Sequence, residues 1–241
     1  MRRVVFTSSA ATIGPRDDGL PADENEPLHL PPNRFPYAHS KLQAEQVVAE
    51  AVEQGQDVVT VNPVVVMGPG DLNMISGTFI TQIKRFQWLV PITNGGISVI
   101  DVRDVARYHL AAAARGKTGE RYILMTANYS NRDWFNMIAE VVGAARPRIP
   151  APRFMLPVTA FAIDALRAVG LSTPIDSNQA RLGGRYIYFD GSKAHVAFGS
   201  PRIDMQQSLR DTYQWYAEHG YIQEDFIARF AARSARLLRM T

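Results

Sequence analysis

Tyr37 and Lys41 stand four residues apart in the segment PYAHSK, behind a strand-like run, VVFTSSA, that carries Ser8 and Ser9. On a helix, residues four apart are stacked neighbours, so the lysine ammonium can stand beside the tyrosine phenol. A nearby cation favours a phenolate over a phenol, and a tyrosine in that setting can exchange a proton with a hydroxyl or a carbonyl. A serine hydroxyl at the end of a neighbouring strand would orient the same oxygen. These residue types together indicate hydride transfer at a carbon that bears an oxygen.

The spacing of Tyr37 and Lys41 is weak evidence by itself, because such a pair on a helix is more often simply exposed. Both serines also fit the role of caps at a strand end. The elements around them make the pattern specific. Residues 3–8 read as a buried strand, a proline-rich loop follows over 15–36, and a helix is expected from Tyr37 to about Gln54.

The rest of the chain alternates between strands and helices as far as Met125 and is mostly helical beyond it. Pro63–Met74 is expected to be a loop, and a proline-rich stretch at 147–157 indicates a boundary between two lobes. The expected strands are 58–62, 97–100, 122–125 and 186–189, and the expected helices are 77–86, 102–114, 131–143, 157–169, 192–198 and 205–219. In the helix 131–143, Trp134, Phe135 and Ile138 are expected to face inward.

Several segments, in this order, resemble the extended short-chain dehydrogenase/reductases of the NAD-dependent epimerase/dehydratase superfamily: VVFTSSAATIG, PYAHSKLQAE, VNPVVVMGPGD, ISVIDVRDVARYHLAAA, GERYIL, FDGSKA and WYAEHGY. The resemblance runs from Arg3 to about Ile222. It implies an α/β fold, a partial Rossmann-like, doubly wound parallel sheet with a smaller, mostly helical substrate lobe. Residues 1–146 would form the C-terminal part of the NAD(P)-binding domain, and residues 147–241 mainly the substrate lobe.

By the same resemblance, Ser9, Tyr37 and Lys41 are the catalytic serine, tyrosine and lysine, and the cofactor is NAD or NADP. Ser8 is expected to support Ser9, with the alternative that Ser8 itself is the donor. The candidate cofactor contacts are Ser8, Tyr37, Lys41, Pro63, Val64 and Val65, the last three with the alternative of a purely structural turn. The substrate candidates, chosen from their position, are Asn73, Met74, Arg181 and Arg185.

A dinucleotide pyrophosphate is normally held by a strand, a glycine-rich turn and a helix N-terminus. None of the seventeen glycines forms that fingerprint, and Met1 stands directly before the serine strand. We therefore expect the sequence to be an N-terminally truncated chain or one whose start was assigned at an internal methionine, with a shortened protein that has lost the cofactor as the alternative. An edge of the serine strand left open to water would favour aggregation of the isolated chain.

The composition narrows the other functional classes. The chain has 241 residues, a formal net charge of +3 and no cysteine, so disulfides and thiolate metal sites are excluded. No metal cluster is evident, and Asp101 and Asp104 fit a helix N-terminus better than a metal site. Four arginines near the C-terminus gather on a helix-like pattern that we expect to dock on the protein itself or to fray, with contact to a membrane or a nucleic acid as the alternative. We expect a cytoplasmic protein without a nucleic-acid or membrane partner.

The function expected from sequence is reduction of a ketone or aldehyde by hydride transfer, with Tyr37 as general acid. The dipeptide Asn62-Pro63 resembles the corresponding pair in relatives of dihydroflavonol reductase more than that in sugar-nucleotide epimerases. A nucleotide-sugar epimerase or dehydratase is the enzymatic alternative, since Arg181 or Arg185 can bind a diphosphate. A non-catalytic binding protein built on the same fold is the alternative from another class. The resemblance also implies a homodimer through helices 37–54 and 77–86.

Overall fold

The computed structural model describes residues 3–152, 154–171 and 177–222. Its strands are β1 (Val4–Thr7), β2 (Val58–Pro63), β3 (Val65–Met67), β4 (Pro91–Thr93), β5 (Gly96–Asp101), β6 (Arg121–Leu124), β7 (Ala127–Ser130), β8 (Ile149–Ala151) and β9 (Tyr186–Ile187). The helices are α1 (Pro36–Glu53), α2 (Thr78–Phe86), α3 (Val102–Arg115), α4 (Asn131–Val141), α5 (Met155–Ala168), α6 (Ser177–Leu182), α7 (Ser192–Phe198) and α8 (Met205–Glu218), with short 3-10 turns η1 (Ala10–Thr12) and η2 (Gln87–Leu89).

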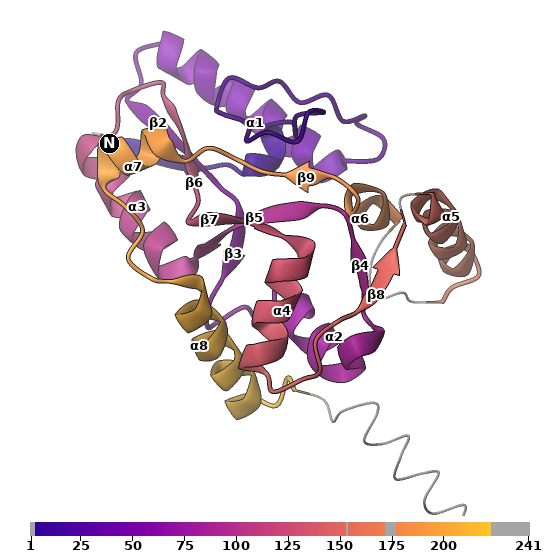
Figure 1. Cartoon of the computed structure of the whole chain (residues 1–241). Helices are drawn as coiled ribbons and strands as arrows, with labels where there is room; N and C mark the ends of the chain where they lie inside the picture. Colours follow the sequence, from indigo (N-terminus) through magenta and orange to yellow (C-terminus); the bar gives the residue numbers. More distant parts are fainter. Residues whose placement is uncertain (1–2, 153, 172–176, 223–241) are drawn as a thin grey trace, which may run out of the picture.

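The main sheet is parallel and has the order β1, β2, β6. All six residues of β2 are buried, as expected for a strand covered on both faces. Successive side chains of a strand point to opposite faces. Val59 and Val61 pack with α3 and α7 on one face, whereas Asn62 reaches Glu45 of α1 on the other. Figure 1 shows α1 and the α3–α7 pair on opposite sides of these strands. This arrangement confirms the predicted α/β class.

A second sheet continues from the end of β2, and it corrects one prediction. Residues 63–74 were expected to be a loop, but they contain β3, which pairs in parallel with β5. Strand β5 also pairs with β7 in antiparallel and with β9 in parallel orientation. The expectation was wrong because the prolines and glycines that flank β3 hide a strand of only three residues.

Helix α3 begins as the Asp101 pattern predicts. The Asp101 carboxylate accepts a hydrogen bond from the Arg103 amide over 2.7 Å, which caps the helix. Asp104 has a different use from the expected first-turn charge. It is buried and accepts hydrogen bonds from the amides of Arg202 and Ile203, so it holds the chain that enters α8.

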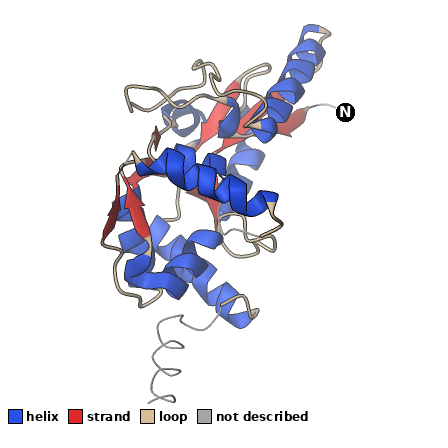
Figure 2. Cartoon of the chain, turned by 90° about the vertical axis from the view of Figure 1, so that its right-hand side faces the viewer, coloured by secondary structure: helices blue, strands red, loops and turns tan. Residues whose placement is uncertain are grey.

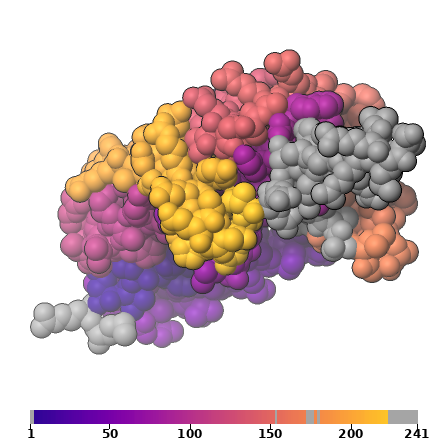
Figure 3. Space-filling model, turned by 90° about the horizontal axis from the view of Figure 1, so that it is seen from below, coloured from indigo at the N-terminus to yellow at the C-terminus, as the bar shows by residue number. Residues whose placement is uncertain are grey.

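Helices α2, α4 and α8 form a separate core around Trp134 and Ile138, both of which are buried as predicted. Figure 3 shows α8, in yellow, lying against the pink surface of α4. Gly77, at the start of α2, lies so close to Tyr216 of α8 that a Cβ atom there would be 1.7 Å from the tyrosine hydroxyl oxygen. Glycine at this position therefore permits the two helices to approach.

Helix α5 stands at one edge of the molecule beside α6 (Figure 1), and Figure 2, turned so that this edge faces the viewer, shows the helices outside the strands. Only Ala160 and Ile163 of α5 are buried. Within the described ranges, no helix combines the length and the apolar character that crossing a membrane requires.

Candidate active site

The two serines of the predicted site follow β1 directly, but their hydroxyls have different partners. Ser8 is buried, and its hydroxyl donates a hydrogen bond to the Glu45 carboxylate. Ser9 caps the turn η1, because its hydroxyl oxygen accepts a hydrogen bond from the Ala11 amide over 3.2 Å. Ser8 is thus fixed from α1, whereas the half-buried Ser9 stands at the turn where the strand ends.

Tyr37, Lys41 and Glu45 follow one another at intervals of four residues, so they share one face of α1. This face lies across the carboxyl end of β1. The Lys41 ammonium donates to the Thr7 carbonyl oxygen over 3.1 Å and lies 5.7 Å from the centre of the Phe6 ring. The helix therefore carries Tyr37 and Lys41 to the end of the serine strand, and the ammonium is held by that strand.

Tyr37 lies in the first turn of α1, which Pro36 starts at a position suited to proline. The residue is 58% exposed, and its hydroxyl has no hydrogen-bond partner among the described residues. An exposed phenol beside the carboxyl end of a parallel strand is accessible to a ligand in the place where open α/β sheets bind ligands.

A polar cluster beneath these residues fixes the geometry, and we define it as Glu45, Thr12, Asn62 and Arg121. The Asn62 side-chain amide donates to Glu45 Oε1 over 2.7 Å, and the Thr12 hydroxyl lies 3.0 Å from the same oxygen. Arg121 Nε lies 3.2 Å from Glu45 Oε2. The carboxylate is thus almost fully buried but paired with a cation and with hydrogen-bond donors, the condition under which a buried charge is tolerated.

Glu45, Thr12 and Arg121 are functional residues that the sequence did not predict. The spacing of Tyr37, Lys41 and Glu45 was available as a signal, because a third residue at the same interval must share their helix face. Thr12 and Arg121 carried no such signal, since their proximity arises only when β6 and η1 meet across β2.

The predicted cofactor contacts at Pro63, Val64 and Val65 lie at the same end of the sheet as the serines. Thr7, the last residue of β1, pairs with Val61 of β2. Pro63 therefore lies two residues further along β2, beyond the end of β1. The Val64 amide donates to the Leu124 carbonyl oxygen over 3.2 Å, and Val65 is paired with Val99 in the second sheet. Since proline has no amide hydrogen and that of Val64 is used, contacts of Pro63 and Val64 to a nicotinamide would use carbonyl or side-chain atoms.

Asn73 and Met74 lie in the loop between β3 and α2. Asn73 is exposed, whereas Met74 adopts a left-handed backbone (φ 54°) and packs against the Trp134 core. Asp71 holds this loop, accepting hydrogen bonds from the amides of Ser76 and Gly77 over 3.0 Å. Burial opposes ionisation of Asp71, but these amides outweigh it and hold the pKa of the carboxyl below its usual range.

The two arginines proposed for a diphosphate are both engaged in ion pairs. Arg181 of α6 lies 3.0 Å from the Asp164 carboxylate of α5. Arg185 is paired with Asp17 of the loop that precedes α1. A diphosphate at either position would therefore compete with a carboxylate that is already in place.

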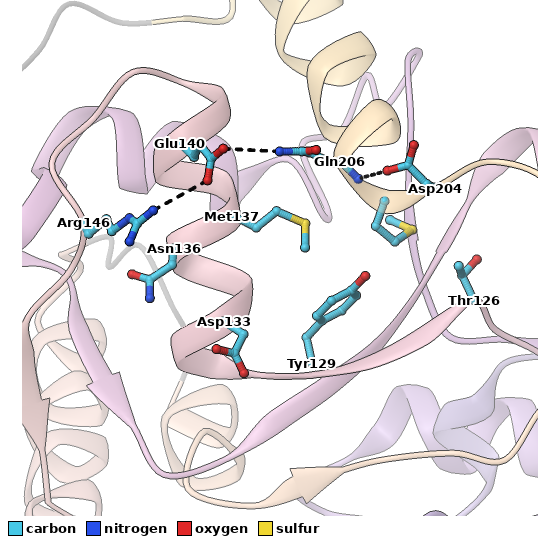
Figure 4. A pocket seen from close by; sticks show the side chains of 10 residues that line it. Thr126, Tyr129, Asp133, Asn136, Met137, Glu140, Arg146, Asp204 and Gln206 are labelled. Atoms are coloured by element: carbon cyan, nitrogen blue, oxygen red, sulfur yellow. Dashed lines mark hydrogen bonds and ion pairs between the residues drawn. The ribbon is translucent and has the colours of Figure 1, made fainter.

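Two cavities of about 520 Å³ each flank the connection from β6 to β7. The first lies between α4 and the start of α8 (Figure 4), where Tyr129 and Met137 face Asp133, Glu140 and Asp204. The second lies beside α7, lined in part by Met125, Phe189 and His195. The residues predicted for catalysis, cofactor or substrate line neither cavity, so the candidate site is the open carboxyl edge of β1 and β2.

A comparison with protein families decides which family has this arrangement. Residues 1–124, the part that contains the serine strand, the tyrosine–lysine helix and the strands beside them, match the model of the NAD dependent epimerase/dehydratase family. The chain belongs to the NAD-dependent epimerase/dehydratase family. Members of the family are NAD(P)-dependent oxidoreductases or epimerases, so the predicted family, enzyme class and cofactor are confirmed.

Two relatives and one solved structure match over most of this chain. It is 35% identical over 230 residues to a putative dihydroflavonol 4-reductase from Synechocystis sp., covering 92% of this chain and 66% of that protein. It is 28% identical over 231 residues to sterol demethylase protein B from Methylococcus capsulatus, covering 92% of this chain and 68% of that protein. A solved nucleoside-diphosphate-sugar epimerase from Pseudomonas aeruginosa has a TM-score of 0.74 at 26% identity, over 92% of this chain and 68% of that one. The chain thus spans about two thirds of the length of these relatives, and the Rossmann-like fold predicted from sequence is confirmed.

Proposed function

We propose that this chain carries the proton-transfer site of an NAD(P)-dependent reductase that acts on a ketone or an aldehyde. The observation that carries the proposal is the placement of α1 across the end of β1. One face of the helix presents the exposed Tyr37 hydroxyl, while Lys41 is held 3.1 Å from the carbonyl oxygen of Thr7, one residue before the two serines.

In the proposed reaction, Tyr37 donates its proton to the carbonyl oxygen as that oxygen becomes a hydroxyl. The Ser9 hydroxyl orients the same oxygen, and the Lys41 ammonium stabilises the negative charge left on the phenolate. The bound nicotinamide would supply the hydride. Lys41 and the carboxyl end of β2 at Pro63 and Val64 would hold its nicotinamide end, and the unpartnered phenol beside them fits a ligand at this edge.

The names of relatives support a reductase. Similar proteins include a tetraketide alpha-pyrone reductase from Arabidopsis thaliana and a cinnamoyl-CoA reductase from Petunia hybrida. Solved structures of the same fold are described in complex with NADPH and with NAD. Each of these names concerns the relative itself: the two reductase names suggest reduction of a carbonyl here, and the two complexes suggest a nicotinamide cofactor.

A sugar-nucleotide epimerase is the second candidate, favoured by the solved epimerase of similar fold. It is the weaker one because its substrate has a diphosphate, and both candidate arginines, Arg181 and Arg185, already have carboxylate partners.

A homodimer through α1 and α2 is also part of the proposal. Helix α1 has eighteen residues, of which only Ala38 is fully buried, so most of its surface is available to a second copy. Sedimentation of the purified chain over a range of concentrations tests it, and a mass that stays monomeric would contradict it.

The test of the reaction is turnover of NADH or NADPH with a panel of aldehydes and ketones, followed by nicotinamide absorbance. Net oxidation of the cofactor supports a reductase, whereas interconversion of sugar isomers without net oxidation supports the epimerase. Tyr37→Phe should lower the rate by a factor on the order of 100 or more, because general acid catalysis contributes about that much. An unchanged rate in Tyr37→Phe would indicate that the tyrosine has no part in the chemistry.

A further inference from the structure

Helix α5 and the residue before it expose several large apolar side chains on one side. Phe154, just before the helix, is 77% exposed, and Val158 and Phe161 are 68% and 73% exposed. With Ala165 and Val169, these residues follow at steps of three and four, so they form one continuous face, which we call the α5 apolar face. Large apolar side chains exposed singly are normal, but a contiguous apolar patch indicates an interaction site.

Helix α5 is apolar on its exposed side as well as on its buried side, whereas an ordinary surface helix turns a polar side outward. Its two charged residues are Asp164 and Arg167. Asp164 is paired with Arg181 of α6, and Arg167 lies at helical spacing from the buried Ala160 and Ile163. The protein therefore covers the side of the helix that carries Ala160 and Ile163, and the α5 apolar face lies on the uncovered side.

The segment that includes this face is basic. Residues 144–171 contain four arginines and one acidic residue, Asp164, which gives a charge of +3 from four positive and one negative group. Arg148, the residue before the strand β8 that leads to α5, is exposed beside the exposed Ile149. An apolar helix face next to exposed arginines is the combination that binds an anionic lipid surface.

The size of the face favours a bilayer over a second copy of the chain. A helix of fourteen residues is about 21 Å long and about 10 Å wide, so the face offers roughly 200 Å². A stable dimer buries about 800 Å² on each partner. A bilayer has no such requirement, because apolar side chains enter it individually from the surface of a projecting helix.

The chain's own C-terminal residues are a less suitable occupant. Residues 223–241 contain four arginines and two acidic residues, so they have the same sign of charge as the segment around α5. Like charges oppose docking of one basic segment on another.

We infer that the α5 apolar face docks on an anionic membrane surface, with Phe154, Val158, Phe161 and Val169 entering the interface and Arg148 facing the lipid headgroups. This inference replaces the expectation from sequence that the chain has no membrane partner. Sequence periodicity identified the helix, but it did not show which side of the helix the fold covers.

The test is flotation of the purified 241-residue chain with phosphatidylcholine vesicles, with and without about 30% phosphatidylglycerol as the anionic lipid. The test variant combines Val158→Gln, Phe161→Gln and Val169→Gln, since glutamine is a good helix former. A matched control combines Val47→Gln, Leu110→Gln and Val196→Gln, which change exposed apolar residues on α1, α3 and α7. Far-ultraviolet circular dichroism checks that each variant is folded.

We expect the wild type to bind anionic vesicles, the control to bind equally, and the α5 variant to bind at least about tenfold less, because three interfacial side chains are lost. The inference is overturned if the wild type does not bind, or if the folded α5 variant binds as the wild type does. It is also overturned if a variant of the same chain with glutamine at Arg229, Arg233, Arg236 and Arg239 loses all binding while the α5 variant keeps it. Sedimentation that shows a wild-type dimer, and a monomer only for the α5 variant, would assign the face to a second copy instead.

Discussion

The hydroxyl of Ser8 donates a hydrogen bond to the carboxylate of Glu45, two helical turns beyond Tyr37 on α1. This bond joins the end of β1 to the helix that carries the proposed proton donor. Because Lys41 binds the carbonyl oxygen of Thr7 on the same face, the helix is fixed to the strand at two consecutive turns. The distance between the serine turn and the tyrosine is therefore set by α1 as a rigid element.

Replacement of the buried carboxylate should weaken this attachment. In Glu45→Gln the side chain keeps its size, but Arg121 loses its ion pair and the hydroxyls of Ser8 and Thr12 lose a charged acceptor. We expect the free energy of unfolding to fall by about 2–4 kcal/mol, measured by urea denaturation. Glu53→Gln, at the exposed end of α1, is the control and should change it by less than about 0.5 kcal/mol. Equal midpoints for the two variants would contradict the prediction.

Lys41 should matter more for turnover than for stability. Lys41→Met removes one partly exposed hydrogen bond to Thr7, so we expect a loss of at most about 1 kcal/mol of stability. If the ammonium stabilises the tyrosine phenolate, carbonyl reduction should fall on the order of 100-fold. Lys117→Met, at an exposed site in the turn before β6, should leave both quantities as in the wild type. A Lys41→Met variant that keeps the full rate would show that the lysine has no part in the reaction.

Gly77 should be intolerant of any side chain. In Gly77→Ala the added Cβ would lie 1.7 Å from the Tyr216 hydroxyl oxygen and 2.3 Å from its ring carbon, so α2 and α8 must move apart. We expect a destabilisation of about 3 kcal/mol or more, at the upper end of the range for overpacking. Gly70→Ala is the control, because it meets open space and has only the left-handed backbone (φ 93°) to oppose it, at a cost of about 1–2 kcal/mol. Equal melting temperatures for the two variants would contradict the close approach of Gly77 to Tyr216.

The Asp71 carboxyl should contribute to stability in a pH-dependent way. Its pKa in the folded protein is lowered, so its contribution is fully present above the pKa of the unfolded chain, about 4, and is lost as the pH falls through the lower folded value. The difference in unfolding midpoint between the wild type and Asp71→Asn should be constant from pH 7 to about pH 5 and then shrink toward pH 3. A difference that grows on acidification would mean that the pKa of Asp71 is raised in the folded protein, contrary to the prediction.

The sequence was sufficient for the elements that have a strong local pattern. The helix at Tyr37, the buried strand at Val58 and the inward side of Trp134 all follow from periodicity and flanking residues. Strand β7 was missed, because its residues ANYS have no alternation and are held only by pairing with β5. The Glu45 cluster was missed for a similar reason, since a glutamate on a helix is usually solvated and only the meeting of α1, β2 and β6 buries this one.

Pairing in the main sheet has a consequence for how fast the chain folds. Val4 pairs with Val58 and Thr60 with Arg121, so the partners are 54 and 61 residues apart along the chain. Long loops must close before either pairing can contribute to stability, and this makes such sheets slow to form. Residues 58–70, which include the whole of β2, carry no charge and are rich in valine. Until β1 and β6 arrive on its two sides, β2 has two unpaired edges and is prone to self-association, and a chaperone that binds apolar extended segments would be expected to protect it.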